Sequence, residues 1–291
     1  MTDPDPLYPA AADLEASWSR RVRAEREQVE RLREVEDGPD FYGPSTARFR
    51  ADPRRRDDPT LDVLLALARP GETWLDVGAG AGRYALPLAL AVRDVVAVDP
   101  SPGMLAALGE GMAEHGIGNV RAIEDRWPPS PGSAAAGLRA DVALIANVGH
   151  DVAEIGTFLD ALEAAAGRLC VAVMAERAPS SAVDALWPEV VGEARLALPA
   201  LPELEAILLA RGRLFEVRLV ERTGPGFGSL DEALAFTRRQ LWARPGSERD
   251  RRLAAALPGF LEEREGRLAI GAGPGRSGVV SWVPGPAGGS A

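Results

Sequence analysis

The residues of this chain with the clearest chemical meaning lie around a short run of alternating glycines. Gly78, Gly80 and Gly82 follow an apolar segment that begins at Thr73, and a helical pattern starts at Ala85. A glycine turn between a strand and a helix lets a ligand approach bare backbone, because glycine has no Cβ. The start of the helix also offers free N–H groups and partial positive charge to a carboxylate or phosphate. This stretch therefore predicts a binding site for a nucleotide-like ligand.

Two aspartates accompany the turn. Asp76 lies two positions before Gly78, at the end of the predicted strand, and Asp99 ends a second apolar strand that starts at Asp94. A carboxylate in the position of Asp99 can accept both ribose hydroxyls of a nucleoside whose other end lies on the glycine turn. Several classes of nucleotide-binding enzyme share that arrangement, so Asp99 by itself does not separate them.

Three interpretations of the turn remain open at this point. A dinucleotide fingerprint needs a third glycine where this chain has Arg83, and Gly82 comes one residue early. The carboxylate of Asp76 would repel a pyrophosphate but would attract the ammonium group of a bound amino acid. A tight strand-to-helix turn without any ligand is the third interpretation of the same residues.

The run from Asp76 to Gly82, Asp-Val-Gly-Ala-Gly-Ala-Gly, resembles the first motif of the class I methyltransferases that depend on S-adenosyl-L-methionine (SAM). The run from Asp99 to Met104 is similar to a further motif of that family, in which the methionine forms part of an apolar wall for the adenine. The resemblance covers about residues 61–175. It implies SAM as the cofactor, with its ammonium group at Asp76 and its ribose at Asp99.

The resemblance also assigns roles to the ends of the next two strands. In that family an acidic residue after the third strand often accepts a hydrogen bond from the adenine amino group, which implies Glu124 or Asp125 here. The end of the fourth strand passes beside the methyl-bearing sulfur, which places Asn147 and Val148 there. The complete set of expected cofactor-binding residues is Asp76, Gly78, Gly80, Gly82, Asp99, Pro100, Met104, Glu124, Asp125, Asn147 and Val148.

His150 is the titratable imidazole nearest to this expected site, because it follows the fourth strand directly. A general base is needed only if the methyl acceptor arrives protonated, and we expect His150 to orient or deprotonate the acceptor. A loop histidine bonded to the backbone is the alternative. Two histidines and one cysteine are too few for a zinc cluster, so we expect no metal site.

Apolar segments and helical patterns alternate through the resembling region. Near-continuous apolar runs suit a parallel sheet that is covered by helices on both faces. The resemblance implies a Rossmann-like α/β fold, with a seven-stranded, mostly parallel sheet in the order 3-2-1-4-5-7-6 sandwiched by helices. Alternation predicts one further strand at 214–221, and an apolar run predicts the last strand at 278–283.

Other regions are expected to surround this sheet. Residues 1–59 are expected to form an N-terminal helical extension or lid, and residues 60–284 the methyltransferase domain. Within that domain, residues 178–201 and a helical insertion at 222–277, before the last strand, are expected to build the acceptor pocket. Residues 285–291 are expected to be a disordered tail. The helix of the extension has one narrow apolar stripe, which suits packing on its own domain or a homodimer seam.

The composition of the chain argues against two kinds of partner, nucleic acids and membranes. The net charge is −10 and the pI about 4.9, which argues against general nucleic-acid binding because phosphate contacts supply most of that affinity. The fourth strand also lacks the Asn-Pro-Pro-Tyr motif that marks DNA-base methylation in the resembled family. No apolar run reaches the roughly 20 residues needed to span a bilayer. The N-terminus is acidic and proline-rich, unlike a signal peptide, so we expect a cytoplasmic protein without membrane contact.

The leading functional hypothesis is a methyltransferase that transfers the methyl group of SAM to an O or N atom of a small molecule. A SAM-binding protein without transfer activity, acting as a sensor or accessory subunit, would carry the same binding residues. An NAD-linked oxidoreductase is a third hypothesis, and both Asp76 and Arg83 argue against it.

Overall fold

The computed structural model describes residues 9–36, 38, 40, 46, 49–222, 226–264, 266–270 and 275–285. The start of the expected N-terminal extension, residues 1–8, lies outside the described residues, as does the expected tail beyond residue 285.

A seven-stranded sheet forms the centre of the molecule. Its strands are β1 (Thr73–Val77), β2 (Asp94–Asp99), β3 (Val120–Glu124), β4 (Ala140–Ala146), β5 (Ala166–Ala175), β6 (Phe215–Arg222) and β10 (Gly275–Trp282). They stand in the order β3-β2-β1-β4-β5-β10-β6. The first five strands are parallel, and β10 runs antiparallel to both of its neighbours. Because β10 is the seventh strand of this sheet along the chain, the predicted order is confirmed.

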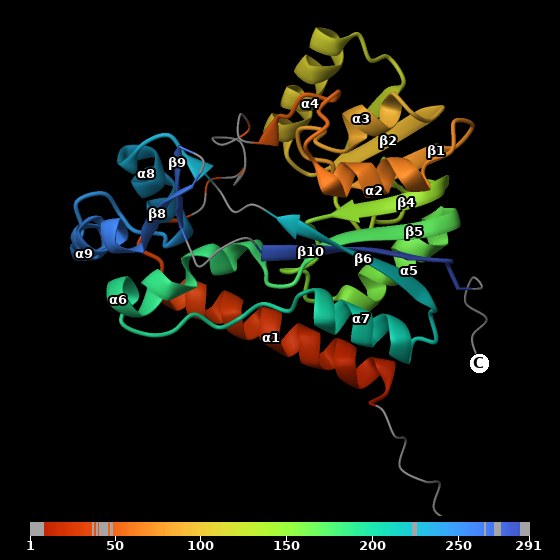
Figure 1. Cartoon of the computed structure of the whole chain (residues 1–291). Helices are drawn as coiled ribbons and strands as arrows, with labels where there is room; N and C mark the ends of the chain where they lie inside the picture. The colour runs from red at the N-terminus through yellow and green to blue at the C-terminus, as the bar shows by residue number, and fades with distance from the viewer. Residues whose placement is uncertain are drawn as a thin grey trace, which may run out of the picture.

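Helices cover both faces of the sheet, as Figure 1 shows. One face carries α2 (Pro59–Leu67), α3 (Ala85–Ala89) and α4 (Pro102–His115), and the other carries α1 (Ala11–Leu32), α5 (Ile155–Ala165) and α7 (Leu201–Ala210). Successive side chains of β1 point to opposite faces of the sheet. Leu75 and Val77 lie in the core with α5, whereas Trp74 lies in the core with α2. Burial on both sides explains the near-continuous apolar runs of the central strands.

The segments after β5 and β6 build a smaller unit with its own core. It comprises η2 (Pro179–Leu186), α6 (Trp187–Val191), β7 (Gly226–Phe227), α8 (Leu230–Gln240), α9 (Glu248–Ala256), η3 (Leu257–Phe260), β8 (Leu261–Arg264) and β9 (Arg267–Ile270). Trp187, Phe227 and Leu253 are fully buried in this core. The expectation of a helical insertion was incomplete, because β7, β9 and β8 form a three-stranded antiparallel sheet.

The long helix α1 joins this smaller unit to the main sheet. Its Trp18 donates from Nε1 to the carbonyl of Val152 at 2.9 Å, just after β4. Further along the helix, Glu25 forms a buried ion pair at 2.5 Å with Arg195, whose guanidinium lies over the ring of Trp187. Figure 1 shows α1 running beneath α7 and reaching α6. The apolar stripe of this helix is therefore buried against the chain itself, with Trp18 and Val22 in the main core.

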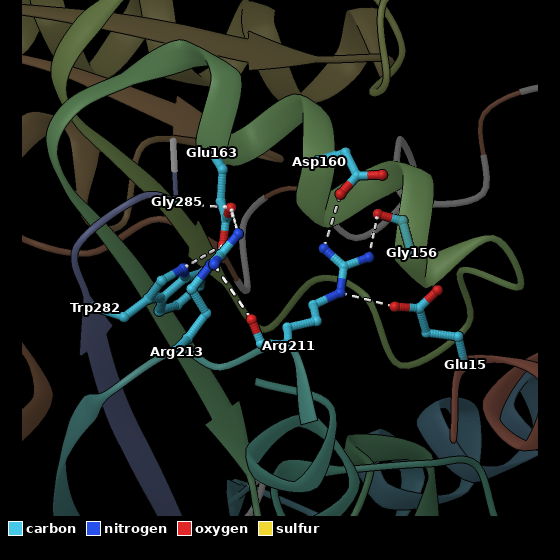
Figure 2. A network of polar contacts seen from close by, with 8 residues as sticks. All are labelled: Glu15, Gly156, Asp160, Glu163, Arg211, Arg213, Trp282 and Gly285. Atoms are coloured by element: carbon cyan, nitrogen blue, oxygen red, sulfur yellow. Dashed lines mark hydrogen bonds and ion pairs between the residues drawn. The ribbon is translucent and has the colours of Figure 1, made fainter. Parts of the chain in front are cut away.

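A polar network fixes the outer edge of the sheet to α5 (Figure 2). The carboxylate of Glu163 accepts two hydrogen bonds of 2.8 Å from Arg213 and one of 2.9 Å from Nε1 of Trp282. The amide of Gly285 donates to the same carboxylate at 3.2 Å. Glu163 is buried, so these partners replace the water that its charge has lost.

Arg211 forms the second half of this network. It donates to Glu15 of α1 at 2.7 Å, to Asp160 of α5 at 2.8 Å and to the carbonyl of Gly156 at 3.0 Å. Figure 2 shows its guanidinium between α5 and the start of α1. One side chain thus holds three segments that are distant in the sequence.

We expect Glu163→Ala to destabilise the fold by about 3–5 kcal/mol, because it leaves the half-buried Arg213 and the indole N–H of Trp282 without their partner. Equilibrium urea unfolding measures the change. The control is Glu154→Ala, which removes an ion pair between side chains that are 64% and 60% exposed, and should cost below about 1 kcal/mol. Equal losses in the two variants would contradict this account.

Candidate functional site

The glycine turn after β1 is tied to the end of β2 by backbone hydrogen bonds. The amides of Gly78 and Ala79 donate to the carbonyl of Val98 at 2.7 and 3.1 Å. The amide of Gly80 donates to Oδ2 of Asp99 at 2.8 Å. The turn and the second aspartate are therefore held together at the carboxyl edge of the sheet, as the sequence predicted.

At two of the three glycines, neighbouring side chains leave no room for a Cβ. Gly78 has φ +73°, and a Cβ there would lie 2.4 Å from Cγ2 of Val148, which follows β4. A Cβ at Gly82 would lie 2.4 Å from Cδ1 of Leu108 in α4. The amide of Gly82 is also used within the turn, by the carbonyl of Ala79 at 3.0 Å. Gly82 thus lets α4 approach the turn, and Gly78 lets Val148 approach β1.

Gly80 is the glycine whose surroundings are open. A Cβ there would meet only the sulfur of Met104, at 3.8 Å. Met104 is buried with Ala81 and Ala107 in a small apolar cluster under the start of α4. This placement agrees with the expectation of an apolar wall beside the turn. Pro100, which precedes that helix, is exposed at the same edge.

Asp99 lies in the last position of β2, beside Glu124 of β3. Its Oδ1 accepts from the amide of Ser101 at 2.9 Å, and burial raises the pKa of its carboxyl. Each carboxylate oxygen has two lone pairs, so one bond to each from the backbone leaves capacity for two hydroxyl donors. Asp40, from the segment after α1, accepts from the hydroxyl of Ser101 at 2.8 Å and adds negative charge near Asp99.

Asp76 has the least satisfied carboxyl group of the site. It is 2% exposed, and its Oδ1 has no hydrogen-bond partner among the described residues. Burial, and then the charge of Asp99, raises the pKa of Asp76 to about 7. A buried carboxylate without a partner is costly, and a ligand that brings a positive charge would offset that cost.

The two acidic candidates after β3 have different surroundings. Glu124 is exposed next to Asp99 and remains accessible. Asp125 accepts from the amides of Arg126 and Ala135, each at 2.8 Å, so its carboxylate shapes the loop that follows. Of the pair, the arrangement favours Glu124 as the contact for an adenine amino group.

The loop after β4 begins with two of the predicted residues, Asn147 and Val148. Asn147 has φ 58° and donates from its amide to the carbonyl of Val173 at 2.8 Å. That bend directs the chain back, so that Val148 covers Gly78. Asn147 itself is exposed at the carboxyl edge.

His150 is buried, with 5% of its surface exposed. Its Nδ1 lies 2.8 Å from the carbonyl oxygen of Pro199. A carbonyl oxygen only accepts, so Nδ1 carries the proton and Nε2 carries the lone pair. Nε2 has no partner among the described residues, and burial lowers the pKa of the imidazole. The structure therefore holds a neutral imidazole with a free acceptor nitrogen.

Sequence patterns did not reveal the partner of His150 or the charges around the start of α3. Pro199 lies 49 positions from His150 along the chain. Arg83, which argued against a dinucleotide, pairs with Asp58 at 2.8 Å. Asp58 also pairs with Arg55 at 2.9 Å. Arg83 and Asp58 are 25 positions apart, so no local spacing reveals that pair, whereas Arg55 and Asp58 are three positions apart.

A cavity of about 130 Å³ lies beyond the carboxyl end of β5. Its lining includes Glu176, Arg195, Leu198 and Ala200, the last two being next to Pro199. Among the described residues, no group of three or more histidine, cysteine, aspartate or glutamate side chains could hold a metal ion. Across the same described residues, none of the helices combines the length and apolarity that a membrane span requires.

Comparison with known proteins agrees with this geometry. A family model described as a methyltransferase domain matches residues 75–165. The ubiquinone biosynthesis O-methyltransferase of Azorhizobium caulinodans is 36% identical over 85 residues, which are 29% of this chain and 32% of that protein. The match thus spans about a third of the length of that relative.

Solved structures support the fold. The YcgJ protein of Bacillus subtilis superposes with a TM-score of 0.52 at 15% identity, over 77% of this chain and 97% of that one. A SAM-dependent methyltransferase of Geobacter sulfurreducens, in complex with S-adenosyl-L-homocysteine, superposes with a TM-score of 0.51 at 17% identity, over 84% and 97%. These likenesses concern the fold of the sheet and its helices.

The strand order, the glycine turn and the matched segment define a Rossmann-like methyltransferase domain. The domain model matches about a third of the chain, and the fold is that of the class I SAM-dependent methyltransferases, whose cofactor is SAM. The residues present fit that cofactor: the unpartnered oxygen of Asp76 suits its ammonium group, and Asp99 suits its ribose. The open face of Gly80, with Met104 below it, suits the close approach of a nucleoside.

The raised pKa of Asp76 leads to a stability prediction for the ligand-free protein. The carboxyl shifts from its ordinary value of 3.8 to about 7 on folding, so its stabilising neutral form is lost as the pH rises through that window. We expect Asp76→Asn to melt above the wild type at pH 8, by at least about 2 °C. The difference should vanish below about pH 4.

Differential scanning calorimetry at both pH values measures this effect. Asp94→Asn, at the exposed start of β2, is the matched control and should show no pH-dependent difference. A lower melting temperature of Asp76→Asn at pH 8 would show that the carboxylate has a stabilising partner in the free protein.

Proposed function

We propose that the protein transfers the methyl group of SAM to an O or N atom of a small-molecule acceptor. The observation that carries this proposal is the buried, unpartnered carboxyl oxygen of Asp76 beside the glycine turn. A pyrophosphate would add negative charge to that position, whereas the ammonium group of an amino-acid ligand neutralises it. The name of the curated relative, an O-methyltransferase, supports the same reaction class.

When bound, SAM supplies a methyl group that is already activated on a sulfonium sulfur. Because the reaction is an in-line displacement, the protein's main task is to align acceptor and donor and to exclude water. Val148 packs over Gly78 at the end of β4 and provides an apolar surface next to the turn. The loop after Val148 carries a buried titratable side chain, His150.

In this proposal His150 is the general base. Its Nε2 accepts the proton of an acceptor hydroxyl or ammonium group, while Nδ1 keeps the ring oriented on the carbonyl of Pro199. The lowered pKa keeps the imidazole neutral, and therefore able to accept a proton, at neutral pH. Helix α1 supports this loop, because Trp18 and Arg26 donate to the carbonyls of Val152 and Asp151.

The expected acceptor pocket is formed by segments that flank His150. The stretch 193–200 carries the Pro199 carbonyl and is fixed to α1 through Gln28, which donates to Ala194 and accepts from Leu196, each at 2.8 Å. The smaller unit that contains α8 and α9 lies on the side towards which β6 points in Figure 1. We assign the extension at 1–59 and the segments 178–201 and 222–277 to enclosing the acceptor. The net charge of −10 favours a small molecule over a nucleic acid.

The first test is binding and turnover. Calorimetric titration with S-adenosyl-L-homocysteine (SAH) should show a single site, and Asp99→Asn should weaken it by about 1–3 kcal/mol, the scale of a hydrogen bond to a charged group. Asp94→Asn, on the same strand but at its exposed start, should bind as the wild type does.

A panel of hydroxyl- and amine-bearing small molecules, assayed with SAM for SAH formation, tests the reaction itself. Formation of SAH with any of them supports methyl transfer. Binding without turnover across the panel would favour a SAM-binding sensor or accessory subunit. A preference for NAD over SAH in the titration would contradict the assignment of the site.

We expect His150→Gln to lower kcat/KM by about 10²–10⁴-fold, the usual contribution of a general base, with SAH affinity unchanged. The wild-type kcat/KM should rise with pH through an apparent pKa below the ordinary 6.5 of histidine, and the variant should lose that rise. His115→Gln, at the end of α4, removes the other histidine and is the control. Unchanged turnover of His150→Gln at every pH would remove the base role.

A further inference from the structure

Arg222 is a half-buried arginine without a partner among the described residues of the fold. It is the last residue of β6 and lies opposite Gly275 of β10. Within the part of the chain that the structure describes, its guanidinium makes no hydrogen bond and no ion pair. Other partly buried arginines are paired: Arg195 with Glu25, and Arg213 with Glu163.

Two further arginines gather around Tyr84, a neighbour of Arg222. The ring of Tyr84 has the guanidinium of Arg55 at 5.7 Å and that of Arg83 at 5.8 Å. Both of these arginines share a single carboxylate, that of Asp58. Two guanidinium groups for one carboxylate leave a net positive charge at the start of α3, and Arg222 lies within its field.

The energetics of Arg222 point to a missing anion. Burial lowers the pKa of the Arg222 guanidinium most; Tyr84 acts in the opposite direction, and the like charge of Arg83 lowers the pKa further. A desolvated cation that is repelled by its neighbour costs stability, because nothing in the fold replaces its lost hydration. The nearby carboxylate at the end of β5, Glu176, is already engaged by Arg276 at 2.7 Å. An anionic ligand could therefore form the hydrogen bonds and the ion pair that this guanidinium does not form within the fold.

The position of Arg222 in the sheet indicates which ligand provides the anion. The proposed adenosine contacts, Asp99 and Met104, follow β2, on the opposite side of β1 from β6. Arg222 instead acts on His150, whose pKa its positive charge helps to lower. As the last residue of β6, which runs parallel to β5, Arg222 lies at the carboxyl edge of the sheet, the edge that also carries the loop with His150.

We infer that Arg222, with Arg83 beside it, binds an anionic group of the methyl acceptor, so that the acceptor is a small molecule with a carboxylate or a phosphate. This inference rests on the proposed function. The guanidinium fork matches the oxygens of either group and donates two hydrogen bonds to it. The methionine carboxylate of SAM offers the same chemistry, so the test must separate the two sources.

Inorganic phosphate is the probe, titrated by calorimetry into protein that is saturated with SAH. Because SAH already contributes its own carboxylate, phosphate bound under these conditions reports on the acceptor side. We expect the wild-type complex to bind phosphate, and Arg222→Met to bind it at least about tenfold more weakly. The matched control is Arg218→Met, which removes an exposed arginine from the same strand and should leave phosphate binding unchanged.

The melting temperature distinguishes ligand binding from a structural role. Arg222→Met removes an unpaired, repelled charge, so the ligand-free variant should melt at or above the wild-type temperature. Arg222→Lys keeps the charge without the planar fork and should bind phosphate with intermediate affinity.

Three outcomes would overturn the inference. One is phosphate affinity in Arg222→Met equal to that of the wild type. Another is phosphate binding to the free protein that SAH abolishes, which would assign the anion to the cofactor's carboxylate. A third is no phosphate binding by a wild-type protein that binds SAH. Failure of SAH itself to bind is recorded separately in the first titration and contradicts the proposed function.

Discussion

A carboxyl group buried without a full set of partners, at the tip of β1, is the constraint on which the rest of the site depends. Asp76 is 2% exposed, and burial raises its pKa to about 7. The fold tolerates this cost because β1 lies between β2 and β4 and its neighbouring residues are buried in both cores. The glycine turn that follows, and the aspartate at the end of β2, are then arranged around a position that favours a positive charge.

Some polar groups of the structure are paired within the fold, and others are left without partners. In the framework, Glu163 accepts from Arg213, Trp282 and Gly285, and Arg211 links α1 to α5 (Figure 2). At the carboxyl edge, the oxygen of Asp76, Nε2 of His150 and the guanidinium of Arg222 have no partners among the described residues. Polar groups that a fold leaves unsatisfied are where a ligand can gain the most.

Helix α1 connects these two kinds of region. Its first half is held by Arg211 and by the main core, and its second half is held by Arg195 and the segment 193–196. Between them, Trp18 and Arg26 fix the backbone of the loop that carries His150. An N-terminal helix therefore supports the loop that carries His150, at the carboxyl edge of the sheet, and it also packs on the smaller unit that contains α6, α8 and α9.

Local patterns in the sequence predicted the strands of the main sheet, and the family resemblance implied their order. Local patterns also led to the proposed cofactor half of the site. Apolar runs separated by helical periods gave β1 to β5, and the spacing of Asp76, Gly78 and Asp99 marked two adjacent strand ends. The small sheet β7-β9-β8 was missed because its strands have two to four residues, too few for a period to show.

Only the tertiary structure revealed the surroundings of His150 and Arg222. The Pro199 carbonyl that fixes the tautomer of His150, the shared carboxylate of Asp58 and the unpaired state of Arg222 depend on segments brought together by folding. The structure also showed that Gly82 serves the packing of α4 on the turn. A binding motif can be recognised in the sequence because one turn, made of consecutive residues, contacts one part of a ligand. The burial of a side chain and the net charge around it depend on residues that are far apart in the sequence, so no local spacing predicts them.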